Sequence, residues 1–171
     1  MSNGKKLSGT APTKRIVGGI SRRALMIGLA GVAGTGALGW SLLGSSEPAN
    51  AQTITVWKSS TCGCCGEWVK HMRASGFRVE THDMDDVTPI RRRHGVPGEL
   101  SSCHTAMVGG YAIEGHVPAA DIKRLLREGT KVKGLAVPGM VIGSPGMEQG
   151  PAQPYATIAF DGRGHWVFEQ H

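Results

Sequence analysis

Three of the four cysteines lie within four residues of one another, in the segment Thr61-Cys62-Gly63-Cys64-Cys65-Gly66. Cys62 and Cys65 have the C-x-x-C spacing of redox-active thiol pairs, and Cys64 adds a third thiol between them. Three thiolates this close repel one another unless a cation lies among them, and redox exchange needs only two. The segment therefore favours metal binding, and thiol–disulfide exchange is the alternative.

The elements that must position these thiols are predicted from residue periodicity. Alternating β-branched and polar residues indicate strands, and apolar residues three or four apart indicate helices. In chain order we expect strand 54–57, helix 62–75, strand 77–82, helix 87–94, strand 105–108, strand 111–113 and helix 119–127. The order β-α-β-α-β-β-α is that of the thioredoxin core, so we predict an α/β, thioredoxin-like fold. A Gly/Pro-rich loop at 131–154 and a C-terminal hairpin, with strands 155–160 and 165–169, complete the prediction.

The predicted helix at 62–75 begins at the cysteine cluster. Its N-terminus offers unpaired N–H groups and the positive end of the helix dipole, and both favour a thiolate. The fourth cysteine, Cys103, directly precedes the predicted strand 105–108, where thioredoxins carry a cis-proline beside their C-x-x-C. We therefore expect Cys103 to lie beside Cys62, Cys64 and Cys65. A structural disulfide, for example between Cys103 and one of the other three, is the alternative.

Four clustered thiols with thioethers nearby are typical of a copper(I) site. Structural zinc sites usually use two separated C-x-x-C pairs, and iron–sulfur clusters use more open spacing. Soft thiolates and thioethers suit copper(I), and four cysteines can hold more than one ion. Met140 and Met147 each follow a Pro-Gly turn and are secondary candidate ligands, with core packing as the alternative. Met107 is expected to fill the core.

Two histidines are further secondary candidates for the metal. His104 follows Cys103, but it faces the opposite way on a regular strand and joins the site only if the strand is broken there. His116 lies just past the predicted strand 111–113. For both, an ordinary buried or surface histidine is the alternative.

The charge of the chain is concentrated in its first 51 residues. The net charge is +6, of which residues 1–51 carry +5 and residues 52–171 carry +1. The nearly neutral domain at 52–171, with few aromatic residues, does not support nucleic-acid binding. The consecutive arginines at 91–93 are expected on a solvated helix face.

Residues 1–51 have the three parts of an export signal. A basic segment with Arg22-Arg23 precedes the uncharged stretch 24–43, and Ala49-Asn50-Ala51 is a small-x-small cleavage site. Ser21-Arg22-Arg23 resembles a twin-arginine signal. We expect removal of 1–51 and a periplasmic domain at 52–171. The alternative is an uncleaved inner-membrane anchor, the one case in which the protein has a membrane partner.

The joint set of motifs resembles the CopG-type periplasmic copper-resistance proteins over about residues 53–160. The segments that carry the resemblance are Thr61–Trp68, Ser102–Ala106, Gly109–Pro118, Gly134–Met140 and Gly143–Glu148. The resemblance implies a thioredoxin-like fold and copper bound by Cys62, Cys64, Cys65 and Cys103. It also implies a role in copper tolerance with other periplasmic copper-handling proteins, and it leaves open whether the protein is an enzyme.

Overall fold

The computed structural model describes residues 51–171, and the structural statements below concern this part of the chain. The predicted export signal at 1–51, with Arg22-Arg23, lies outside it except for Ala51. Within residues 51–171, no helix is long and apolar enough to cross a membrane.

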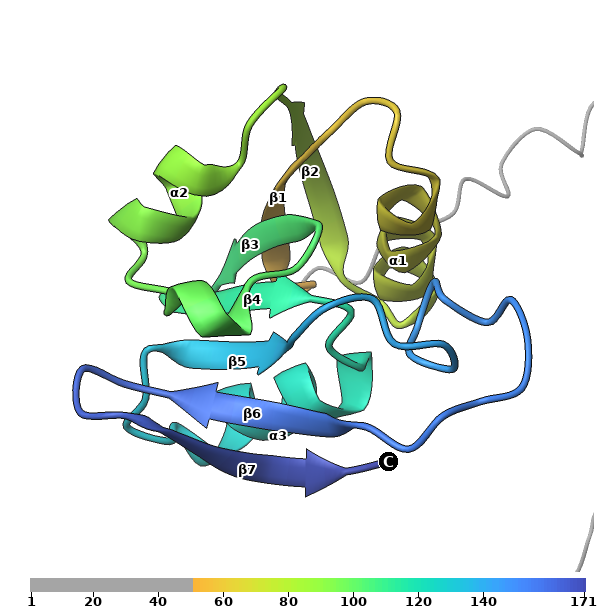
Figure 1. The fold of residues 1–171 in the computed structure, drawn as a ribbon. Coiled ribbons are helices and arrows are strands. Elements are labelled where there is room, and N and C mark those ends of the chain that lie inside the picture. Colours follow the sequence, from red (N-terminus) through yellow and green to blue (C-terminus); the bar gives the residue numbers. More distant parts are fainter. Residues whose placement is uncertain (1–50) are drawn as a thin grey trace, which may run out of the picture. The chain divides into compact units, whose positions relative to one another are not determined.

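Seven strands form one mixed sheet in the spatial order β2-β1-β3-β4-β5-β6-β7 (Figure 1). The strands are β1 Thr53–Lys58, β2 Arg78–Asp83, β3 His104–Val108, β4 Tyr111–Gly115, β5 Gly134–Val137, β6 Ala156–Phe160 and β7 His165–Gln170. The helices are α1 Gly63–Ala74, α2 Thr88–Arg93, the short 3₁₀ helix η1 Gly98–Leu100, and α3 Ala119–Glu128.

The first seven long elements form the predicted thioredoxin-like core. Strand β1 pairs in parallel with β2 and antiparallel with β3, and β3 pairs antiparallel with β4. Each predicted element is present within one or two residues of its expected bounds, and the C-terminal hairpin is formed by β6 and β7. The α/β, thioredoxin-like prediction is therefore confirmed.

The predicted loop at 131–154 is wrong at one point, because it contains strand β5, Gly134–Val137. This strand pairs in parallel with β4 and antiparallel with β6, so it joins the hairpin to the core sheet. All four of its residues are buried, so its sequence lacks the alternation of apolar and polar residues that marks a half-exposed strand. A short apolar segment without this alternation is not recognised as a strand from periodicity. A Cβ on Gly134 would lie 1.9 Å from the Ala112 carbonyl oxygen, so only glycine fits there.

Helices α1 and α3 cover one face of the sheet, and α2 with η1 lies toward the other (Figure 1). Trp68 and Met72 of α1 and Ile122 and Leu125 of α3 are buried against the first face. Leu100 of η1 packs with Phe160 and Met107 on the second face, as expected for Met107. The β1–α1 junction and the start of β3 meet at one end of this arrangement.

Candidate metal centre

The N-terminus of α1 presents three cysteines. Cys62 is the N-cap residue, and Cys64 and Cys65 lie in the first turn. The turn that leads into the helix is held by a hydrogen bond from the Cys62 N–H to the Ser59 carbonyl, 3.2 Å long. Cys65 is buried, and Cys62 and Cys64 are half-buried. A disulfide joins Cys62 to Cys65.

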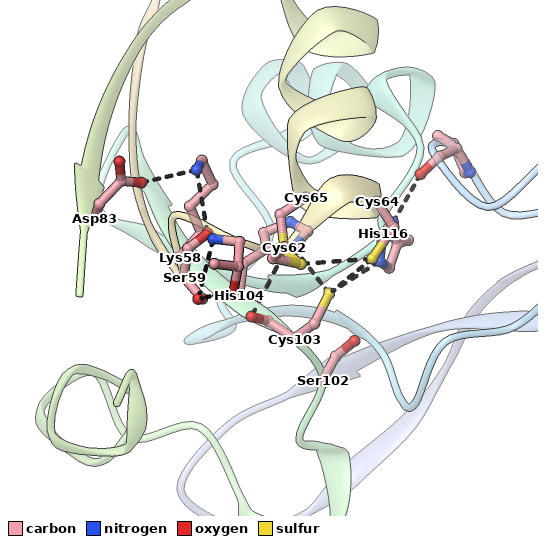
Figure 2. The surroundings of a disulfide bond; sticks show 12 residues. Lys58, Ser59, Cys62, Cys64, Cys65, Asp83, Ser102, Cys103, His104 and His116 are labelled. Carbon is pink, nitrogen blue, oxygen red and sulfur yellow. Dashed lines mark hydrogen bonds and ion pairs between the residues drawn. A yellow bond between two sulfur atoms is a disulfide. The ribbon is translucent and has the colours of Figure 1, made fainter. Parts of the chain in front are cut away.

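Cys103 lies beside the other three cysteines, as the fold predicts (Figure 2). The Cys64 Sγ is 3.5 Å from the Cys62 Sγ and 3.9 Å from the Cys103 Sγ. All four sulfur atoms lie within 4.8 Å of one another. Cys64 and Cys103 are free thiols, so the alternative of a disulfide holds for Cys62 and Cys65 and is wrong for Cys103 in this structure.

Both candidate histidines contact Cys103. The Cys103 Sγ is 3.0 Å from His116 Nε2 and 3.4 Å from His104 Nδ1, and the three atoms form a second group within 4.8 Å. The required break is present, because β3 begins at His104 and Cys103 lies in a bend just before it. The alternation of a regular strand therefore does not separate their side chains.

The surroundings keep both imidazoles neutral. His116 Nδ1 lies 2.8 Å from the Pro145 carbonyl oxygen and donates its proton there, which leaves a lone pair on Nε2 toward Cys103. Burial lowers the pKa of His116. Burial, helped by His116 and Lys58, lowers the pKa of His104 to about 3. His104 packs against the Trp68 ring at 4.5 Å between centroids, and its Nε2 has no hydrogen-bond partner among residues 51–171.

The Cys103 thiol holds its proton tightly. Burial, followed by the neighbouring Cys64, raises its pKa to about 12. A thiolate at this position therefore needs a compensating cation, and a metal ion that binds here must displace a proton.

A polar network that sequence reasoning missed fixes the backbone around Cys103. The buried Glu114 carboxylate accepts hydrogen bonds from Arg91 Nε at 2.8 Å, Ser102 N at 2.7 Å and Thr105 Oγ1 at 2.6 Å. Arg91 also donates to the Ser102 carbonyl at 2.8 Å. The expected solvated face for Arg91 is thus wrong. The one usable signal is Glu114 itself, an acid inside an otherwise apolar strand.

The segment between β5 and β6 borders the cluster at two points. The Gly139 N–H donates to the Ser101 carbonyl, and the Gly139 carbonyl accepts from the Ser102 hydroxyl. A Cβ on Gly146 would lie 2.8 Å from the Cys64 carbonyl oxygen. Met140, next to the first contact, is 58% exposed, and Met147, next to the second, is half-buried. Their role as ligands stays a prediction.

Known proteins of this architecture include two solved structures, titled copper resistance protein copG, forms 1 and 2. Each is 42% identical to this chain with a TM-score of 0.67, and the match covers 71% of this chain and 98% of the other. This chain belongs to the CopG-like family. A family model described as a protein of unknown function, DUF411, matches residues 100–147 of this CopG-like chain. A search among curated proteins gives no match.

The match at 100–147 spans the second half of the CopG-like site. It contains Cys103, His104, His116 and both loop methionines, whereas the three cysteines of α1 precede it. The sheet pairing of β1 with β3 brings these two stretches together.

Proposed function

We propose that this CopG-like protein binds copper(I) through the thiolates of Cys62, Cys64, Cys65 and Cys103. The observation that carries the proposal is that the four sulfur atoms lie within 4.8 Å of one another. The Cys62–Cys65 disulfide occupies two of these sulfurs, so the full donor set requires reduction of that bond by two electrons.

The donor set explains the choice of metal. Thiolates are soft ligands that favour copper(I), and they can bridge ions, so the cluster can take more than one copper. Neutral His104 and His116 offer further nitrogen donors at Cys103, and Met140 and Met147 are secondary thioether candidates. The solved relatives are titled copper resistance proteins, which supports copper over zinc.

We place this binding in copper tolerance in the bacterial periplasm. The protein sequesters copper or passes it to other periplasmic copper-handling proteins after export by the twin-arginine route. Replacement of Arg22-Arg23 by Lys-Lys should block export, which fractionation of cells measures. Normal export of that variant would point to another route.

The copper proposal is tested by titrating copper(I) against a chromogenic chelator, with metal analysis of the recovered protein. The fully reduced protein should outcompete a chelator of moderate affinity. The matched control is the same protein with its Cys62–Cys65 disulfide intact, which should bind fewer ions with lower affinity. Equal binding by both forms, or no competition by the reduced form, contradicts the four-thiolate site.

The secondary ligands need a separate comparison. Met140→Leu and Met147→Leu should each weaken copper(I) binding if the thioethers bind the metal. Met107→Leu is the matched control, since Met107 packs in the core. Equal affinities for all three variants would exclude the loop methionines as ligands.

A thiol–disulfide or copper oxidoreductase is the second candidate function. It is favoured by the Cys62–Cys65 disulfide at the N-terminus of α1, with Cys62 more exposed than Cys65. Cys62 would then attack and Cys65 would resolve. Catalytic reduction of insulin disulfides, lost in Cys62→Ser, tests the thiol activity. A change in copper oxidation state over many turnovers tests the copper activity.

A further inference from the structure

The four sulfurs form two pairs that touch through Cys64, and this contact suggests an activity that needs no metal. We propose that the protein carries two dithiol couples, Cys62–Cys65 and Cys64–Cys103, and that Cys64 passes a disulfide from the first to the second. The inference goes beyond copper binding, because it concerns the metal-free protein.

The geometry places Cys64 between the two couples. Its Sγ lies 3.5 Å from the Cys62 Sγ, which is half of the existing disulfide, and 3.9 Å from the Cys103 Sγ, which is a free thiol. These are contact distances for sulfur atoms. Thiol–disulfide exchange proceeds by attack of a thiolate on one sulfur of a disulfide, so each step begins from a contact that already exists.

The local structure makes Cys64 the attacking group. It lies in the first turn of α1 and is in contact with one sulfur of each couple. It is half-buried, whereas Cys65 is buried beneath the turn with its Sγ 3.7 Å from the Cys103 carbonyl oxygen. Cys64 can therefore reach the outer sulfur of the disulfide, and Cys65 is the leaving group.

The exchange takes two balanced steps. In the first step the Cys64 thiolate attacks the Cys62 Sγ, the Cys62–Cys65 bond breaks, and a Cys62–Cys64 bond forms. Cys65 departs as a thiolate and takes up a proton equal to the one Cys64 gave up.

In the second step Cys103 passes its proton to His116 Nε2, 3.0 Å from its Sγ, as this sulfur attacks the Cys64 Sγ and forms the Cys64–Cys103 disulfide. Cys62 departs as a thiolate and takes up a proton equal to the one Cys103 gave up. One disulfide and two thiols are present before and after, so no external oxidant or reductant is consumed. The product has a free Cys62 at the surface and a disulfide at Cys103, beside His116.

This transfer of the disulfide between the two couples, called the relay below, is tested on the full chain. The chain is freed of metal by a chelator and oxidised with one equivalent of oxidised glutathione. The protein is incubated at mildly alkaline pH, quenched with acid, alkylated, and mapped by fragmentation mass spectrometry. We expect a population with alkylated Cys62 and Cys65 and a Cys64–Cys103 disulfide. Once the glutathione has been removed, the rate at which this population forms from the Cys62–Cys65 form should not change on dilution, because the transfer takes place within one chain. Alkylation confined to Cys64 and Cys103 at every time overturns the proposal.

Cys64→Ser is the matched variant, because it removes the thiol that joins the couples and preserves the side-chain shape. In this variant, alkylation of Cys62 and Cys65 should fall to background, while Cys103 should still be alkylated. Label on Cys62 that persists would overturn the role of Cys64.

A second variant guards against misfolding of the first. Cys65→Ser should form a disulfide within the monomer, either Cys62–Cys64 or Cys64–Cys103. Only free thiols or chains linked to each other would contradict the relay. Either result leaves the copper proposal standing, since copper is absent throughout.

Discussion

Two buried polar clusters flank the start of β3, and they differ in how completely their groups are paired. On the α2 side, the Glu114 carboxylate accepts three hydrogen bonds and faces Arg91, whose side chain is 11% exposed. On the α1 side, Cys64 and Cys103 are free thiols, and within the described part of the chain His104 Nε2 has no hydrogen-bond partner. We call the first cluster closed, because its polar groups are paired. We call the second cluster open, because it contains thiols and an imidazole nitrogen that are available to bind a ligand.

The degree of pairing assigns a different role to each cluster. A buried polar group without a partner costs about 1–3 kcal/mol, so an open cluster is retained at a cost to stability. The closed cluster around Glu114 fixes the backbone of Ser102 and Thr105, and that backbone holds Cys103 in the open cluster. We therefore interpret the α2 side as a structural support and the α1 side as the ligand site.

Glu114→Ala should give the largest effect, a loss of about 3–5 kcal/mol in the free energy of unfolding, because it leaves the mostly buried Arg91 guanidinium without a counter-charge. Chemical denaturation measures this change. Glu67→Ala is the matched control, since the Glu67–Lys70 ion pair is exposed and should contribute less than about 1 kcal/mol. Similar losses for both variants would mean that the closed cluster is not a structural support.

Cys103→Ser should produce the opposite pattern. It should lower copper(I) affinity by at least about 100-fold, the upper range for loss of a mere outer-shell partner, with little change in unfolding free energy. Chelator competition and denaturation, run on the same variant, separate the two effects. Full copper stoichiometry and affinity in this variant would refute the four-thiol site. A loss of stability like that of Glu114→Ala would mean that the two clusters do not differ in their structural role.

Sequence reasoning found most of the open cluster because its members carry distinctive chemistry. The C-x-C-C spacing and the element order together placed Cys103 beside Cys62 and Cys64. His104 was ambiguous, since only the bend before β3 lets it face Cys103, and a bend has no clear residue signal here.

The closed cluster was beyond sequence reasoning for a physical reason. Arg91 and Glu114 are 23 residues apart, and their contact depends on how α2 folds over the sheet. An arginine in a run of three is ordinary on a solvated helix. Strand β5 was missed likewise, because burial on both faces removes the alternation that marks strands.

Acid should destabilise the folded protein through His104, which makes the open cluster sensitive to pH. Its pKa is about 3 in the folded protein and 6.5 in the unfolded chain. As pH falls below 6.5 the unfolded chain takes up a proton that the folded chain refuses. The contribution of His104 to stability is therefore fully present above about pH 6.5 and declines below it by roughly 1 kcal/mol per pH unit, toward a limit near the folded pKa.

Urea denaturation of the metal-free protein at several pH values measures this slope. His104→Gln is the comparison, because its amide does not titrate and groups that do not interact with His104 cancel in the difference between the two proteins. His116, whose ring lies 5.1 Å from the His104 ring, is the group that does not cancel. Parallel stability curves for the wild type and His104→Gln would show that His104 takes up its proton equally easily in the folded state.

The loop between β5 and β6 touches both clusters, and two glycines allow the smallest test of the comparison. Gly139, which contacts Ser101 and Ser102, and Gly146, which contacts α1, have φ angles of +70° and +86°. Alanine at either position pays the left-handed backbone cost of about 1–2 kcal/mol. At Gly146 the new Cβ also collides, since it would lie 2.7 Å from the Trp68 backbone nitrogen. At Gly139 no atom of the described residues would lie within 4 Å of the new Cβ.

Gly146→Ala should therefore cost about 1–3 kcal/mol more than Gly139→Ala in thermal or chemical unfolding, since the loop must move away from α1. That movement also carries Pro145 away from His116, so copper(I) affinity should fall further in Gly146→Ala. The two variants share the same backbone strain, so any difference between them reports the contact with the open cluster. Equal stability and equal copper affinity would mean that the loop holds neither α1 nor His116 in place.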